Sequence, residues 1–241
     1  MTVPEAGQGG RAPDSVRDRL VLPLDVDDLV SASRLVRQVG DYFGVVKVGL
    51  ELYSAAGPDA ITTFVDQGFT VFADLKLCDI PTTVNHAARV MGALGAGYLT
   101  VHAFGGADMV RAGVEGFDEG ASAVGSTESK VLAVTVLTSD GTAPQHILGQ
   151  RVKVALAAGA GGIVCAGTDV TEARQYGPRL TIAVPGIRPH GSAADDQARR
   201  VTPSQAVRAG ADLLVVGRPV TAAADPVAAA ARLAAEVEAA T

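Results

Sequence analysis

The amino-acid sequence predicts an α/β fold, a single-domain (β/α)8 barrel of the TIM class. Short apolar segments alternate with amphipathic segments along the chain, and several apolar segments are continuous runs of Val, Ile and Leu. Such runs are typical of parallel strands that helices cover. Eight pairs of segments in about 220 residues match the barrel in number and length. An open doubly wound sheet is the alternative, but it usually stops at roughly five to seven strands.

The expected elements follow one another in chain order. Strands are predicted at 20–24, 45–48, 69–75, 98–102, 130–137, 162–165, 181–184 and 213–216. Helices are predicted at 28–40, 58–67, 80–94, 106–120, 150–158, 170–176, 203–209 and 226–239. The glycine cluster at 159–162 precedes a strand, whereas a phosphate-binding glycine loop must follow one, so it indicates a helix-to-strand turn. The helix predicted at 106–120 contains Gly113, Gly116 and Gly120, which indicate that this helix packs closely against a neighbouring element.

Composition excludes several classes of partner. The chain has 241 residues and a net charge of −6, without a basic stripe that could neutralise nucleic-acid phosphates, so no nucleic-acid partner is expected. No apolar stretch approaches the ~20 residues of a membrane span, so no membrane partner is expected. Residues 1–18 are rich in Gly, Pro and charge and lack the apolar core of a secretory signal. They are predicted to form a flexible tail before a barrel domain at 19–241.

The cysteines and histidines offer little chemistry. Cys78 and Cys165 lie in or beside apolar runs, and no Cys/His spacing indicates zinc. Both are expected to be reduced, as in a cytoplasm. His102 ends the fourth strand and is interpreted as a hydrogen-bonded core residue that could line a cavity. No Ser-His-Asp or Cys-His set is placed for nucleophilic catalysis.

The most informative segment is residues 74–81, Asp-Leu-Lys-Leu-Cys-Asp-Ile-Pro, which follows an apolar strand. Because strand side chains alternate between faces, Asp74 and Lys76 are expected to point the same way. Opposite charges at the end of a buried strand are unfavourable unless they are paired or used. Asp79 adds a second carboxylate just past the strand, and Pro81 suits the first turn of the next helix.

Other strand ends supply partners for this segment, because the carboxyl ends of barrel strands converge on one site. Strand 1 ends at Asp25, and strand 2 carries Lys47, one of four lysines in the chain. Three aspartates could suggest a divalent metal, but Lys47 and Lys76 among them would repel one, so no metal is expected. The remaining candidates at strand ends are Thr138, Ser139, Pro185, Arg188, Gly217 and Arg218.

A phosphate site is expected at the loops after strands 7 and 8, where such barrels commonly hold phosphate. Arg188 and Arg218 can bind phosphate oxygens in a bidentate manner, and Gly217 allows close approach of the backbone. The polar loop at 189–200 is long enough to be a lid, and Gln197 within it could donate an amide hydrogen bond.

Together these residues resemble the orotidine 5′-phosphate decarboxylase family, in its bacterial form, over residues 20–238. The segments that carry the resemblance are 24–25, 46–49, 74–81 with Thr83, 137–139, 185–188, 196–197, 202–203 and 216–218. The chain departs from the usual pattern at Pro23 and Thr82, which carry no chemistry. The resemblance implies decarboxylation of orotidine 5′-phosphate to uridine 5′-phosphate and CO2, the last step of pyrimidine nucleotide synthesis, without metal or organic cofactor.

The resemblance also implies a role for each site residue. Lys76 would donate a proton to C6 of the pyrimidine, Asp74 would lie against the departing carboxylate, and Lys47 and Asp25 would hold the ribose and the charged array. Asp79, with Ile80 and Thr83, would reach the site of a neighbouring subunit, so a homodimer is implied. Thr138 or the adjacent Ser139 would contact the base, Pro185 would line the site, and the phosphate would be bound by Gln197, Gly217, Arg218 and Arg188.

Two other functions stay open at this point. A metal-dependent sugar-phosphate decarboxylase or aldolase on the same barrel, of the 3-keto-gulonate 6-phosphate type, has a similar Asp-x-Lys-x-x-Asp segment. It typically carries Glu where Lys47 stands, and Lys47 with the 80–81 Ile-Pro pair separates the two. A catalytically silent phosphate-binding barrel would not need both lysines.

Overall fold

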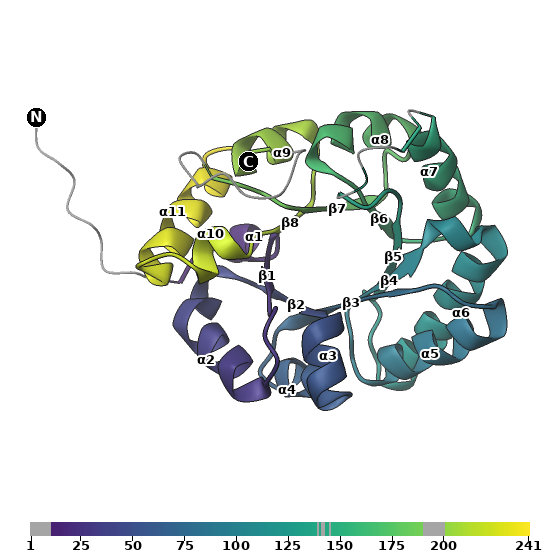
Figure 1. Ribbon diagram of the computed structural model, residues 1–241, viewed down its shortest axis with the longest axis horizontal. Coiled ribbons are helices and arrows are strands. Elements are labelled where there is room, and N and C mark those ends of the chain that lie inside the picture. The colour runs from purple at the N-terminus through teal and green to yellow at the C-terminus, as the bar shows by residue number, and fades with distance from the viewer. Residues whose placement is uncertain (1–10, 139, 141–142, 145, 190–200) are drawn as a thin grey trace, which may run out of the picture.

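A closed parallel barrel forms the centre of the computed structural model, which describes residues 11–138, 140, 143–144, 146–189 and 201–241. The strands pair in chain order and the helices surround them (Figure 1). This confirms the predicted (β/α)8 barrel, and the open doubly wound sheet is wrong. The strands are β1 Leu20–Pro23, β2 Val45–Gly49, β3 Thr70–Leu77, β4 Tyr98–His102, β5 Lys130–Val134, β6 Gly162–Val164, β7 Thr181–Pro185 and β8 Leu213–Val215.

Apolar side chains fill the inside of the barrel. Strand residues alternate between this interior and the outer layer of helices. One buried cluster is contributed by alternate positions of the strands: Val21, Val45, Phe72, Leu132, Ala183, Leu213 and Val215. A larger cluster joins the opposite strand faces to the helices. The barrel is therefore a packed core, and its polar chemistry is displaced to the carboxyl ends of the strands.

All eight predicted helices are present, and the described part of the chain contains three further α-helices that were not predicted. The helices are α1 Asp14–Arg17, α2 Leu29–Val39, α3 Leu50–Ala56, α4 Asp59–Val65, α5 Pro81–Ala93, α6 Ala107–Ala123, α7 Ile147–Ala157, α8 Val170–Tyr176, α9 Pro203–Ala209, α10 Arg218–Thr221 and α11 Pro226–Glu238. The unpredicted helices α1 and α10 have 4 residues each, which is too short for a helical period to be recognised in sequence. Helix α3 has 7 residues, as many as the predicted α4, α8 and α9, so its length does not explain why it was missed. Among the residues described, no helix combines the length and apolar character needed to cross a lipid bilayer.

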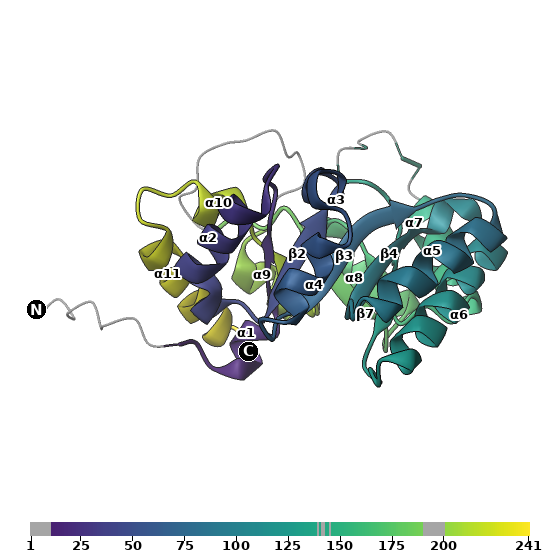
Figure 2. The same ribbon diagram turned by 90° about the horizontal axis from the view of Figure 1, so that it is seen from below.

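Helix α1 lies at the opposite end of the barrel from α3 and α10 (Figure 2). Val16 is buried, and the Arg17 guanidinium donates a hydrogen bond to the carbonyl oxygen of Phe43 at 3.1 Å. Residues 11–18 are therefore attached to the barrel, although the sequence predicted a flexible tail over residues 1–18. That prediction now applies only to residues 1–10, which lie outside the described part of the chain.

Helices α5 and α6 pack backbone against backbone. A Cβ atom at Gly116 would overlap the Asn85 carbonyl, and one at Gly120 would overlap the Arg89 carbonyl. At Gly113 the nearest atoms would be side-chain carbons of Val101 and Val84. The predicted close-packing role of these glycines is confirmed. The contact matters for the site because α5 begins directly after the segment that carries Asp79.

The end of β3 departs from regular strand geometry. Ala73 pairs with Leu99 of β4, but the next pair is Leu77 with Val101, so the register shifts across a bulge. Within it, Lys76 has φ +51°, the only positive φ at a non-glycine residue in the part of the chain described. A left-handed backbone at a side chain with a Cβ costs roughly 1–2 kcal/mol. Such outliers cluster at functional sites.

Candidate active site

A small pocket of about 150 Å³ lies where the strands end inside the barrel. Its charged residues come from β2 and β3, and its remaining wall is mostly apolar. The lining residues are Lys47, Phe72, Asp74, Lys76, Val134, Val136, Leu137, Thr138, Val164, Pro185 and Val215. A wall with charges on one side and hydrocarbon on the other suits a flat, partly polar ligand.

Asp74 stands between two lysines. The Lys76 Nζ atom lies 2.7 Å from Asp74 Oδ1, and the Lys47 Nζ atom lies 3.5 Å from Asp74 Oδ2. Lys47 also reaches Asp25 Oδ1 at 3.2 Å. The structure thus assembles four of the predicted residues into one alternating array, and the expectation that Asp74 and Lys76 point the same way is confirmed.

The array keeps Asp74 ionised. Burial is the largest influence and raises the pKa of this carboxyl group, but the charges of Lys47 and Lys76 and the hydrogen bonds from Lys76 and Thr100 outweigh it. The net result is a pKa below the ordinary value of 3.8. Because the carboxylate side chain is only 15% exposed, water screens these interactions weakly.

A second cavity, of about 510 Å³, adjoins the array between α2 and α10. Asp25 lines this cavity, whereas its partner Lys47 lines the small pocket, so the ion pair separates the two spaces. Gly217 and Arg218 line it as well, together with Arg34, which sequence reasoning did not single out. Two guanidinium groups beside a glycine backbone suit an anion such as phosphate.

Arg188 follows β7 and is 9% exposed, with its Nη1 atom donating to the Ile187 carbonyl oxygen at 3.1 Å. Its backbone N–H donates to the carbonyl of Val201, the first described residue after the loop. Two other predicted contacts, Ser139 and Gln197, lie outside the described residues.

Asp79, Ile80 and Thr83 lie apart from the array. Asp79 Oδ1 accepts a hydrogen bond from the Ile80 backbone N–H at 2.6 Å, and Ile80 is 66% exposed. Within the residues described, no ion pair joins Asp79 to a lysine of its own chain. These three residues face outward at the start of α5.

Sequence reasoning missed Thr100 and the apolar wall. Thr100 of β4 is fully buried, and its hydroxyl oxygen lies 3.2 Å from Asp74 Oδ1. Phe72, Val134, Val164 and Val215 line the pocket but look like ordinary core residues in the sequence. Strand alternation could have placed Phe72, since it lies two residues before Asp74.

His102 lies at the same strand end as Thr100. Burial, followed by the nearby charges of Lys76 and Arg151, lowers the pKa of this imidazole. The neutral form of His102 is therefore favoured beside the array. Its Nδ1 atom is buried and has no hydrogen-bond partner among the described residues, so the expected hydrogen-bonded core histidine is not what the structure shows at this atom.

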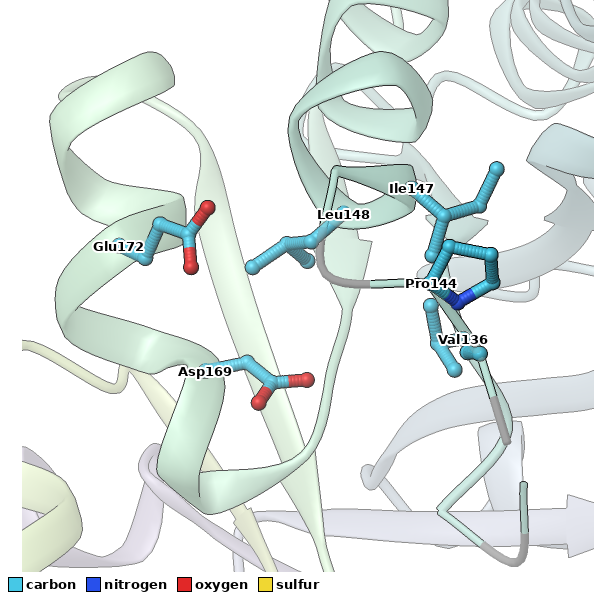
Figure 3. A pocket seen from close by; sticks show the side chains of 7 residues that line it. Val136, Pro144, Ile147, Leu148, Asp169 and Glu172 are labelled. Carbon is cyan, nitrogen blue, oxygen red and sulfur yellow. The ribbon is translucent and has the colours of Figure 1, made fainter. Parts of the chain in front are cut away.

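A third cavity, of about 420 Å³, is larger than the small pocket and lies between α7 and α8 (Figure 3). Val136, Pro144, Ile147 and Leu148 form one side, and Asp169 and Glu172 lie on the other (Figure 3). Two carboxylates would repel an anionic ligand. This cavity is therefore a poorer candidate for binding a phosphorylated substrate than the cavity lined by Arg34 and Arg218.

The described residues contain no group of three or more His, Cys, Asp or Glu side chains that could hold a metal ion. The carboxylates of Asp25 and Asp74 face ammonium groups instead. What this site can offer chemically is a fixed ammonium beside an ionised carboxylate, at the edge of an apolar pocket and next to a cationic cavity.

A closed parallel barrel with such an array at its strand ends defines a barrel enzyme for a phosphorylated substrate. The model of the orotidine 5′-phosphate decarboxylase / HUMPS family matches residues 18–233, and the chain belongs to this family. The orotidine 5′-phosphate decarboxylase of Anaeromyxobacter dehalogenans is 47% identical over 229 residues, which cover 90% of this chain and 97% of the relative.

Two further comparisons agree. The orotidine 5′-phosphate decarboxylase of Thermobifida fusca is 44% identical over 231 residues, which cover 91% of this chain and 95% of the relative. A crystal structure of orotidine 5′-phosphate decarboxylase from Lactobacillus acidophilus superposes with a TM-score of 0.78 at 34% identity, covering 90% of this chain and 98% of that one.

Proposed function

We propose that this protein decarboxylates orotidine 5′-phosphate to uridine 5′-phosphate and CO2, as a carboxy-lyase of pyrimidine nucleotide synthesis. The observation that carries this conclusion is the Lys76 ammonium held 2.7 Å from Asp74 at the edge of an apolar pocket. The family match and relatives of 40–47% identity named orotidine 5′-phosphate decarboxylase support it.

The pyrimidine base occupies the small pocket in this proposal. Its carboxylate is directed toward Asp74, and the two like charges disfavour the bound substrate relative to the neutral CO2 that leaves. The apolar side chains of Val134, Val164 and Val215 suit the uncharged product better than the anion. Thr138 and Pro185, which also line the pocket, contact the base.

Lys76 supplies the proton. When the bond between C6 and the carboxylate breaks, the electron pair stays on C6, and the Lys76 ammonium stabilises it and donates a proton there. The lysine is then neutral and regains a proton from water. Because the charges of Asp74 and Lys47 are fixed before the substrate arrives, little reorganisation is needed at the moment of reaction.

The phosphate group occupies the cationic cavity, where Gly217 and Arg218 bind it, and Arg188 and Gln197 are proposed as further phosphate ligands. Asp25 and Lys47 lie between this cavity and the base pocket and hold the ribose. Binding energy from the phosphate, far from C6, can thus be used to force the carboxylate against Asp74.

We also propose a homodimer in which Asp79, Ile80 and Thr83 complete the site of the partner subunit. The exposed position of Ile80 and the lack of a described lysine partner for Asp79 in its own chain support this. A cytoplasmic location is proposed because Cys78 is an exposed free thiol, which a reducing compartment would preserve.

The test is an absorbance assay of the purified protein with orotidine 5′-phosphate, after exhaustive treatment with EDTA. The expected result is conversion to uridine 5′-phosphate at the same rate with and without the chelator. Activity that disappears with EDTA and returns with Mg²⁺ would instead support a metal-dependent sugar-phosphate enzyme. Absence of turnover under both conditions would support a silent phosphate-binding barrel.

A further inference from the structure

Thr100 occupies the position on β4 opposite the bulge of β3. Ala73 pairs with Leu99, and Leu77 pairs with Val101, so the three residues 74–76 face Thr100 alone. A bulge of this kind leaves backbone groups without their ladder partners. The Lys76 N–H would be such a group, and an unsatisfied N–H in a buried strand is unfavourable.

The Thr100 hydroxyl provides the hydrogen-bond acceptor that the Lys76 backbone N–H would otherwise lack. The Lys76 backbone N–H donates to Thr100 Oγ1 at 2.8 Å. An N–H can only donate, so the hydroxyl accepts this bond, and its own proton is available to Asp74 Oδ1 at 3.2 Å. The same Asp74 oxygen accepts from Lys76 Nζ at 2.7 Å. One hydroxyl thus connects the backbone and, through the carboxylate, the ammonium of a single lysine.

We propose that Thr100 is a positioning residue for the reaction: its hydroxyl holds Lys76 in its left-handed conformation and fixes the Asp74 carboxylate against the Lys76 ammonium. This inference rests on the proposed function. The hydroxyl does not touch the substrate in this account. It determines where the proton donor stands, and a displacement of about 1 Å in a catalytic group can lower the rate roughly 10²-fold.

The alternative is that Thr100 only stabilises the fold. A second buried threonine in the chain, Thr135, serves as a matched control for this alternative. Thr135 follows β5, is 5% exposed, and its hydroxyl donates to the Val164 carbonyl oxygen at 2.8 Å. Like Thr100, Thr135 has a buried hydroxyl group that forms a hydrogen bond, but its partner is a backbone carbonyl outside the charged array. Replacing either threonine by Val removes one buried hydrogen-bonding group of the same size.

The experiment compares Thr100→Val, Thr100→Ser and Thr135→Val with the wild type. Turnover of orotidine 5′-phosphate is measured at several substrate concentrations, and melting temperatures are recorded for all four proteins. The titration of the Asp74 carboxyl is followed by NMR on protein labelled with 13C-aspartate, and its signal is identified by its loss in Asp74→Asn. This last measurement needs no activity.

Thr100→Val should lower kcat roughly 10–100-fold with a much smaller change in KM, because the proton donor is misplaced after binding. Its Asp74 carboxyl should titrate at higher pH, since a hydrogen bond to the ionised form is lost. Thr100→Ser, which keeps the hydroxyl group, should have the wild-type kcat and the wild-type titration of the Asp74 carboxyl. Thr135→Val should melt at lower temperature but keep the wild-type kcat and the wild-type Asp74 titration.

The proposal is wrong if Thr100→Val keeps the wild-type kcat, or if it loses stability as Thr135→Val does with no change in the Asp74 titration. It is also wrong if Thr100→Ser is as slow as Thr100→Val. Should the wild type itself fail to convert orotidine 5′-phosphate, the proposed function fails, whereas an Asp74 titration that moves in Thr100→Val and not in Thr135→Val still identifies the positioning contact.

Discussion

Gly49 lies directly beside the ammonium group of Lys47. A Cβ atom added at Gly49 would be 3.1 Å from Lys47 Nζ and 3.6 Å from Asp25 Oδ1. The backbone of Gly49, at φ −92°, is one that any residue can adopt. A side chain at this position would therefore displace the Lys47 ammonium slightly, whereas the backbone conformation itself does not favour glycine.

Gly49→Ala should for this reason reduce activity while leaving the fold intact. The methyl group would move the Lys47 ammonium away from Asp74 and Asp25, and we expect kcat/KM to fall roughly tenfold or more. Circular dichroism and the melting temperature serve as controls and should stay near those of the wild type. An alanine variant with wild-type kcat/KM would show that Lys47 has room to move without consequence.

Lys76→Ala and Lys76→Gly should both lack activity, since the proton donor is absent from each. General acid catalysis alone contributes roughly 10²–10⁴-fold, and the lost charge stabilisation adds to that. Lys130→Ala, at an exposed lysine on β5, is the matched control and should be as active as the wild type. A Lys76→Ala protein with a tenth of wild-type turnover would contradict the proposed role.

The same two variants should differ in stability. At φ +51°, Ala keeps the roughly 1–2 kcal/mol cost of a left-handed backbone, whereas Gly does not. Glycine also raises the conformational entropy of the unfolded chain, and this lowers the free energy of unfolding of Lys76→Gly by about 0.4–1 kcal/mol relative to Lys76→Ala. Lys76→Gly should therefore have the larger free energy of unfolding, by about 0.5–1 kcal/mol in urea titrations. Equal stabilities would mean that the bulge relaxes when Lys76 is removed.

The depressed pKa of Asp74 makes part of the stability dependent on pH. The folded state favours the ionised carboxylate, so this contribution is complete above the ordinary pKa of 3.8 and is lost as pH falls toward the lower, folded pKa. Wild type and Asp74→Asn should therefore differ most in free energy of unfolding near neutral pH and converge in acid below about pH 4. A difference that stays constant between pH 6 and pH 3 would contradict the assignment.

Mixing Asp79→Ala with Lys76→Ala should recover activity if Asp79 serves the partner subunit. A mixed dimer then has one site with neither substitution. Random exchange of equal amounts makes half of the dimers mixed, so about a quarter of wild-type activity is the ceiling. Mixtures with demonstrated subunit exchange that stay as inactive as either parent would place Asp79 in the site of its own chain.

The strand order and the charged array could be predicted from the sequence because their signals are local. Apolar runs identify the strands, and two-residue spacing predicts that Asp74 and Lys76 share a face, although in the structure a bulge interrupts the regular alternation between them. The bulge and the positive φ of Lys76 could not be predicted, since they depend on the register between β3 and β4. Thr100 was missed for the same reason: a β-branched residue inside a strand is unremarkable until its neighbour across the sheet is known.

The contact between α5 and α6 has a consequence for how this protein can diverge. The spacing of the two helices is set by main-chain atoms meeting at Gly116 and Gly120, which lie against the carbonyl groups of Asn85 and Arg89. Side chains elsewhere on the two helices can therefore be exchanged over evolutionary time without altering that spacing. The segment 78–80, directly before α5, therefore keeps its position even when the surrounding surface residues change.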